Sequence, residues 1–334
     1  MDFGTHVLLK KYLDTFEEDH PLLVSFDLNP DYMEYVEKLL AELDDRPNLK
    51  TKIEEMKDIS NWESTFSELE FARKLKELNP EFIRTEKGSP TPDIKAKVFG
   101  KDVFFEVRMI LENDEARRVY NEIWKIESDL IVKIEFGTLD NEKADRLIGF
   151  IRNKINAKEI GSHSFEDTKI EITKKISVKT KRTAVITFFG LIEIPMEPIR
   201  KKVFRDFYSK LHQFESCSPV FWIIDCQRWK YGIDDFKLIV YGKTVEDLSV
   251  GMRLFGFEDI IKRADGNFGL FEGTNLIPTL TYPEKDGLFF LKEAECLNGI
   301  IAITLRQFHF LINPFAKKQL DSNSIRELKE LFSR

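Results

Sequence analysis

Two acidic residues and one basic residue stand close together in a short stretch with the pattern of a β-hairpin. Residues 93–99 and 102–109 are rich in Ile, Val and Phe, and a Gly-Lys turn signal joins them. Because side chains alternate along a strand, Glu106 and Arg108 share a face, and the hairpin brings Asp93 close to Glu106. Carboxylates on adjacent strands can hold a divalent cation through oxygen ligands, and such a cation activates water.

A third carboxylate precedes the hairpin on a predicted helix. Residues 62–78 have the three-and-four spacing of an amphipathic helix, which ends before Pro80. Glu68 lies roughly 40° from the mean direction of the apolar side chains, whereas Glu63 and Glu70 fall on the far side. A buried carboxylate requires a cation, a donor or a metal, so Glu68 is the acid that we single out on this helix. The alternative is that Glu68 lies at the edge of a broad apolar arc and reaches water.

The order of these elements resembles the PD-(D/E)XK nuclease superfamily. Pro92-Asp93 on one strand and Glu106-Val107-Arg108 on the next carry the resemblance, together with Glu68 on the preceding helix. Asp93 and Glu106 are thirteen positions apart, and the resemblance covers residues 62–136. The family has a helix, three strands, a second helix and a fourth strand around a mixed sheet.

The rest of the resemblance assigns the neighbouring segments. Residues 82–85 correspond to the first strand, residues 112–129 to the second helix and residues 130–136 to the fourth strand. These segments therefore complete the order of elements that the family requires.

The resemblance implies a metal-dependent nuclease that hydrolyses phosphodiester bonds in DNA or RNA. It implies Mg²⁺ (or Mn²⁺) held by Asp93 and Glu106, with Glu68 as an outer ligand. The family's lysine two positions after the glutamate is here Arg108, which can supply positive charge to a phosphate but is not readily deprotonated to act as a base. The implied catalytic set is Glu68, Asp93, Glu106 and Arg108.

Other functions stay open beside this one. Arg108 in place of lysine favours a catalytically inactive nuclease-fold protein that acts as a nucleic-acid-binding or assembly module, unless Lys95 or Lys97 supplies the missing amine. The net charge of −7 favours a structural or interaction protein that binds no nucleic acid. Alternating charges along a hairpin are also the ordinary pattern of a solvated face.

Composition predicts a globular protein of the cytoplasm. The chain of 334 residues is 42% hydrophobic and 33% charged, and its three cysteines form no CxxC pair. Reduced thiols and no structural zinc are therefore expected. No apolar run approaches ~18 residues, and no leader pattern is recognised, so neither secretion nor contact with a membrane is expected. A homo-oligomer is possible.

Basic side chains suggest where DNA or RNA would bind. They are concentrated in three segments, and a local basic surface can bind nucleic acid on an acidic protein. The segments are residues 143–158, 174–182 and 200–210.

The predicted architecture is α/β, with a mixed central sheet flanked by helices. A restriction-endonuclease-like core at residues 61–160 follows an N-terminal helical cap at residues 1–60. Residues 161–334 form a C-terminal α/β elaboration, continuous with the core. Within it, the apolar run 219–224 predicts a strand buried on both faces, and residues 161–164 at its start predict a loop. The tail near Asn313-Pro314 is similar to those of nuclease-like prokaryotic proteins.

Overall fold

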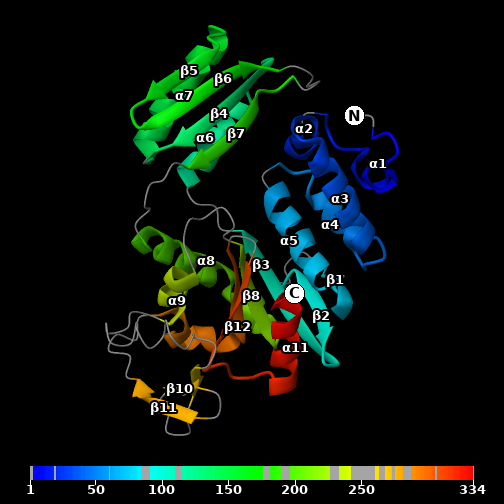
Figure 1. The fold of residues 1–334 in the computed structure, drawn as a ribbon, viewed down its shortest axis with the longest axis vertical. Helices are drawn as coiled ribbons and strands as arrows, with labels where there is room; N and C mark the ends of the chain where they lie inside the picture. Colours follow the sequence, from blue (N-terminus) through cyan, green and yellow to red (C-terminus); the bar gives the residue numbers. More distant parts are fainter. Residues whose placement is uncertain are drawn as a thin grey trace. The chain divides into compact units, whose positions relative to one another are not determined.

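The computed structural model has a mixed α/β fold with two mixed sheets flanked by helices (Figure 1). It describes residues 3–18, 20–59, 61–83, 91–109, 114–137, 139–175, 181–189, 196–225, 233–241, 260–262, 268–272, 275–280, 287–304 and 307–333. The chain divides into two compact units. Unit 1 comprises Met1–Glu42, Ile53–Trp62 and Leu111–Pro195, and unit 2 comprises Leu43–Lys52, Glu63–Ile110 and Met196–Arg334.

Unit 2 is built on a six-stranded sheet with the order β1-β2-β3-β8-β12-β13. Neighbouring strands from β1 to β3 are antiparallel, β3, β8 and β12 are parallel, and β13 is antiparallel to β12. The strands are β1 (Glu81–Phe82), β2 (Ile94–Val98), β3 (Lys101–Met109), β8 (Val220–Asp225), β12 (Gly299–Thr304) and β13 (Gln307–Ile312). A separate three-stranded sheet comprises β9 (Ile260–Lys262), β10 (Phe268–Glu272) and β11 (Asn275–Leu280).

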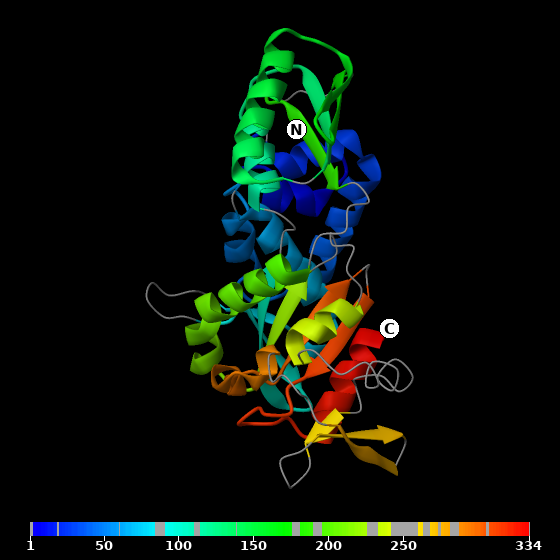
Figure 2. The same ribbon diagram turned by 90° about the vertical axis from the view of Figure 1, so that its left-hand side faces the viewer.

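Helices cover both faces of the six-stranded sheet (Figures 1 and 2). On one face lie α5 (Trp62–Lys74) and α11 (Ser322–Ser333), where the ring of Phe71 packs against those of Phe105 and Phe332. On the other lie α8 (Met196–Ser216) and α9 (Ile233–Tyr241), and two phenylalanines of α8 pack against Trp222 of β8. Short 3-10 helices span Lys76–Leu78, Leu288–Phe290 and Lys292–Cys296.

The predicted hairpin is confirmed as β2 and β3. Phe99 and Gly100 at its tip have positive φ angles of 48° and 79°, which make the tight turn. The C-terminal helix fastens this tip, because the backbone N–H of Phe99 donates to Glu327 and the Lys101 ammonium lies 2.6 Å from the Asp321 carboxylate.

Unit 1 contains N-terminal helices and a second sheet. The helices are α1 (Val7–Leu13), α2 (Pro21–Leu28), α3 (Pro30–Leu43) and the C-terminal part of α4 (Leu49–Glu55). The sheet has the order β5-β6-β4-β7, and α6 and α7 share one apolar core with it. Its elements are α6 (Asp114–Trp124), β4 (Leu130–Phe136), α7 (Asn141–Asn156), β5 (Gly161–Phe165), β6 (Thr168–Lys174) and β7 (Ala184–Phe189).

The prediction for the fourth core strand was wrong. Residues 130–136 do form a strand, β4, but it pairs with β6 and β7 in the second sheet. The strand that pairs in parallel with β3 is β8, whose six residues are all buried, as the apolar run 219–224 predicted. β4 instead alternates between buried and partly exposed residues, which is typical of a sheet with one solvated face.

Two smaller observations complete the fold. Residues 161–164 were predicted as a loop, but they lie in strand β5. This strand forms an antiparallel pair with β6. Among the described helices, none has both the length and the apolar character needed to cross a lipid bilayer.

Candidate functional site

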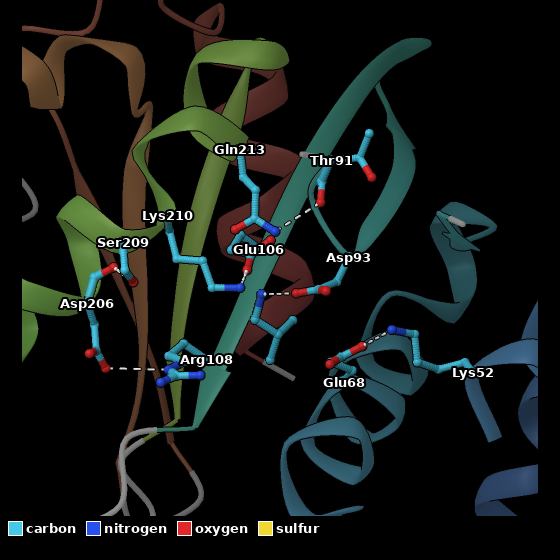
Figure 3. A network of polar contacts seen from close by, with 11 residues as sticks. Lys52, Glu68, Thr91, Asp93, Glu106, Arg108, Asp206, Ser209, Lys210 and Gln213 are labelled. Carbon is cyan, nitrogen blue, oxygen red and sulfur yellow. Dashed lines mark hydrogen bonds and ion pairs between the residues drawn. The ribbon is translucent and has the colours of Figure 1, made fainter. Parts of the chain in front are cut away.

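The hairpin brings Asp93 and Glu106 to adjacent positions. Ile94 of β2 lies opposite Phe105 of β3, so Asp93, one step before β2, faces Glu106, one step further along β3. The Asp93 carboxylate accepts a hydrogen bond of 2.8 Å from the backbone N–H of Val107 (Figure 3). This bond connects β3 to the residue directly before β2. Asp93 is partly buried, whereas Glu106 is 0% exposed.

Helix α8 lies over the face of β3 that carries Glu106 and Arg108. Asp206, Lys210 and Gln213 follow the i, i+4, i+7 spacing that places side chains on one side of a helix. Lys210 Nζ lies 2.6 Å from Glu106 Oε1, and Arg108 Nε lies 3.4 Å from Asp206 Oδ2. Strand β3 and helix α8 are thus joined by two ion pairs (Figure 3).

A third contact from α8 is made to the segment directly before β2. The Gln213 side-chain amide donates a hydrogen bond of 3.2 Å to the backbone carbonyl of Thr91, two residues before Asp93. In Figure 3, Gln213, Lys210 and Glu106 lie next to one another, between α8 and β3. One side of the helix therefore contacts both β3 and the segment that leads into β2.

Several buried polar atoms around Glu106 have no hydrogen-bond partner among the described residues. They are Glu106 Oε2, Gln213 Oε1, Thr91 Oγ1 and the indole nitrogen of Trp222, which is the neighbour of Glu106 across the β3–β8 pair. Buried polar atoms are nearly always bonded, to protein, water or an ion. Oε2 of Glu106, an acceptor in this set, is therefore an atom that suits a water molecule or a cation as its partner.

Burial raises the pKa of the Glu106 carboxyl well above its usual range. The negative charge of Asp93 raises this pKa further, the ammonium of Lys210 opposes the rise, and Glu68 adds a smaller increase. A buried carboxylate is costly unless a positive charge compensates it. Glu106 is therefore a group whose ionisation depends on what cation stands beside it.

Glu68 is buried, as the sequence predicted, and its compensating cation is Lys52. The ammonium of Lys52 lies 2.7 Å from Glu68 Oε2, and both side chains are buried. Helix α5 packs on the face of the sheet opposite to α8, through Phe71 and Phe105. The neighbouring Ser67 donates a hydrogen bond of 2.7 Å to Asp225 at the end of β8.

The three predicted metal-binding acids are not gathered into one cluster. Within the part of the chain that the structure describes, no group of three or more His, Cys, Asp or Glu side chains is arranged to hold a metal ion. Asp93 and Glu106 are neighbours, while Glu68 affects Glu106 only through its charge. The site is therefore a two-carboxylate site with a nearby third charge.

The two lysines considered as substitutes for an amine beside Glu106 have other partners. Lys95 Nζ lies 2.7 Å from Glu81 on β1, and Lys97 lies 3.1 Å from Asp102 near the hairpin tip. The amine at Glu106 comes from Lys210, which the sequence analysis did not single out. The i, i+4, i+7 spacing on α8 was the available signal, but nothing local shows which strand that helix covers.

Residues 200–210, one of the three predicted basic segments, contribute to this site through Asp206 and Lys210. In residues 143–158, Arg146 lies 2.9 Å from Glu166, Lys154 lies 2.6 Å from Glu159, and Lys143 pairs with Asp167. Residues 174–182 lie partly outside the described residues. Lys175 there donates a hydrogen bond of 2.9 Å to the carbonyl of Ser128.

Comparison with protein-family models, with curated proteins and with solved structures finds no match. The residues of the site and their geometry are therefore the basis for assigning a function.

Proposed function

We propose that the protein is a metal-dependent nuclease of the PD-(D/E)XK type, which hydrolyses phosphodiester bonds in DNA or RNA. The observation that carries this proposal is the group of Asp93, Glu106 and Lys210. Asp93, directly before β2, and Glu106, on β3, are cross-strand neighbours; the Glu106 side chain is fully buried, and an ammonium lies 2.6 Å from its carboxylate.

The order of elements in unit 2 supports the same proposal. α5, the strands β1 to β3, α8 and β8 follow one another as a helix, three strands, a helix and a fourth strand. The first three strands are antiparallel, and β8 lies parallel to β3 after the crossover through α8. In this arrangement, α8 and β8 take the places in the family's order of elements that the sequence pattern had assigned to residues 112–129 and 130–136.

The residues present suit Mg²⁺ or Mn²⁺. Mg²⁺ is usually bound by one or two carboxylates, with water and substrate phosphate completing its ligands. Asp93 and the unpartnered Oε2 of Glu106 would supply the two carboxylates. A bound metal would offset the charge of the phosphate and activate water for attack.

The other residues have roles that follow from their chemistry. Lys210, on α8, would hold a proton at Nζ between Glu106 and the phosphate, where its charge stabilises the negative charge that develops in the reaction. Arg108 would bind phosphate without exchanging a proton. Glu68, held by Lys52, would act on the site through its charge alone.

The distribution of charge is compatible with a nucleic-acid substrate. Residues 1–62 contain 15 Asp and Glu against 7 Lys and Arg, which leaves 43 acidic and 44 basic residues in the rest of the chain. The acidic balance of the protein therefore comes from its N-terminal helices and not from the segments that form the site. Association with a polyanion depends on the local surface more than on the total charge.

Cleavage assays test this proposal. The protein would be incubated with linear, circular and single-stranded DNA and with RNA, in the presence of Mg²⁺, Mn²⁺ or EDTA. We expect cleavage that requires the metal and is lost in Asp93→Ala, Glu106→Gln and Lys210→Met. Lys97→Met, which removes an exposed charge from the same sheet, is the matched control and should cleave as the wild type does. Cleavage that survives Glu106→Gln would rule out this site.

A non-catalytic role is the second candidate. Lys210 already pairs with Glu106 and Lys52 with Glu68, so both buried acids have cations without any metal. This arrangement favours a nucleic-acid-binding or assembly module. The same protein preparations distinguish the two roles, because salt-sensitive binding of oligonucleotides without cleavage under any metal condition would select the module.

A further inference from the structure

Arg108 forms an ion pair with an acid that is much more deeply buried than the acid of an ordinary surface ion pair. Its partner Asp206 has only 7% of its side chain exposed, whereas 41% of the Arg108 side chain is exposed. Burying a carboxylate is costly, and a half-exposed ion pair at 3.4 Å adds little to the free energy of unfolding. Arg205 Nε also lies 3.7 Å from the other carboxylate oxygen of Asp206, so Asp206 contacts one arginine with each oxygen, and its Oδ2 fixes the direction of the Arg108 guanidinium.

Among the described residues, the two Nη groups of Arg108 have no hydrogen-bond or ion-pair partner and are available for a ligand. Asp206 is contacted by Nε, so the two Nη groups carry the remaining N–H donors on a side chain that reaches solvent. Two adjacent guanidinium N–H groups match two oxygens of a phosphate, which an ammonium cannot do. An arginine oriented by a buried acid is thus a prepared phosphate-binding group.

The position of this group relative to Glu106 defines what it would bind. Arg108 is two residues further along β3 on the same face, so it lies about 7 Å beyond Glu106 along the strand. Their partners on α8, Lys210 and Asp206, are one helical turn apart, so the two ion pairs follow one another along β3. The guanidinium therefore stands beside the place where Asp93 and Glu106 would act, and not on it.

We propose that Arg108, positioned by Asp206, forms a subsite for a phosphate group adjacent to the one that is cleaved. This inference rests on the proposed nucleic-acid substrate and extends it. It assigns two tasks to two residues: Lys210 provides the ammonium at Glu106, and Arg108 holds the substrate strand. The ligand is a phosphate, either an internal phosphodiester or a terminal phosphate monoester.

Binding measurements with defined oligonucleotides test the subsite. Fluorescence anisotropy would follow labelled single- and double-stranded DNA and RNA, with either a 5′-phosphate or a 5′-hydroxyl, over a series of salt concentrations in EDTA and in Ca²⁺. The variants are Arg108→Met, Asp206→Asn and the double variant, with Lys97→Met as the control for loss of one charge. Circular dichroism would check that each variant is folded.

We expect Arg108→Met to weaken binding roughly tenfold and to reduce the slope of log affinity against log salt by about 0.7 to 0.9. Asp206→Asn should weaken binding although no positive charge is lost, and the double variant should resemble Arg108→Met, because both residues act through one group. Lys97→Met should change neither quantity. An effect limited to 5′-phosphorylated strands would identify a terminal phosphate, and an equal effect on both ends an internal one.

Two results would overturn the subsite: wild-type protein that binds none of these oligonucleotides, or variants that bind as the wild type does. The outcome is separable from that of the proposed function. Binding that depends on Arg108 without any cleavage would refute the nuclease and keep Arg108, positioned by Asp206, as a phosphate-binding group. Cleavage with an unchanged KM in Arg108→Met would support the nuclease and refute the subsite.

Discussion

The ammonium of Lys210 and the carboxylate of Glu106 lie 2.6 Å apart, although the whole of the second sheet stands between them in the chain. This pair links α8 to β3 and supplies a positive charge to the most deeply buried acid of the site.

Removing Lys210 should destabilise the protein more at high pH than at low pH. The pKa of Glu106 is raised, so the folded protein favours the neutral acid, and stability is lost as the pH rises through that pKa. Because Lys210 opposes the rise, Lys210→Met should lower the free energy of unfolding at neutral pH by about 2 kcal/mol. Urea unfolding at several pH values measures this, and adding Glu106→Gln should restore most of the loss. A loss that does not depend on pH would contradict it.

Metal binding should strengthen with rising pH. The metal requires an ionised Glu106, so apparent affinity for Mg²⁺ should increase until the pH exceeds the raised pKa of that carboxyl. In Lys210→Met the pKa rises further, and the transition should move to higher pH. Isothermal titration calorimetry with Mg²⁺ or Mn²⁺ provides the readout. Equal transitions in the two proteins would show that Lys210 does not control the ionisation of Glu106.

The buried pair of Lys52 and Glu68 should matter for stability more than for metal binding. Lys52→Met leaves the Glu68 carboxylate buried without its cation and should cost about 3 kcal/mol of unfolding free energy. Adding Glu68→Gln to that variant should recover much of the loss. By calorimetry, Glu68→Gln alone should reduce Mg²⁺ affinity less than Glu106→Gln does. An equal reduction would identify Glu68 as a direct ligand.

Asp321 should stabilise the protein only above mildly acidic pH. The Lys101 ammonium and the backbone N–H of Ser324 lower the pKa of its carboxyl far below the usual range. The stabilisation is present above the unfolded pKa of about 3.9 and is lost as the pH falls toward the folded value. Asp321→Asn should therefore be less stable than the wild type at pH 7, with a difference that shrinks below about pH 4. Asp102→Asn, near the same hairpin tip, is the control.

Local patterns were enough to predict the elements that carry the acids. The alternation in residues 93–109 predicted β2 and β3, and the apolar arc of residues 62–78 predicted α5 with Glu68 on its buried side. These predictions were confirmed because period and turn chemistry act over a few residues. The buried strand β8 was predicted on the same grounds.

Pairings between distant segments could not be predicted in this way. Residues 130–136 form a good strand directly after a helix, so their pattern matched the expected fourth strand, yet they belong to another sheet. The partner of β3 follows only after that inserted segment. Lys210, Asp206 and Lys52 were missed for the same reason, because an amphipathic helix shows which side is buried but not what covers it.

The insertion also fixes the order in which the site is completed during synthesis. Residues 111–195 emerge from the ribosome after Asp93 and Glu106 but before α8 and β8. Until residues 196–225 have been made, β3 has no parallel neighbour and Glu106 has no ammonium of Lys210 beside it. Burial of Glu106 beside its cation therefore requires segments made late in synthesis, so the parts of the protein proposed to cleave nucleic acid are joined only when most of the chain has been made.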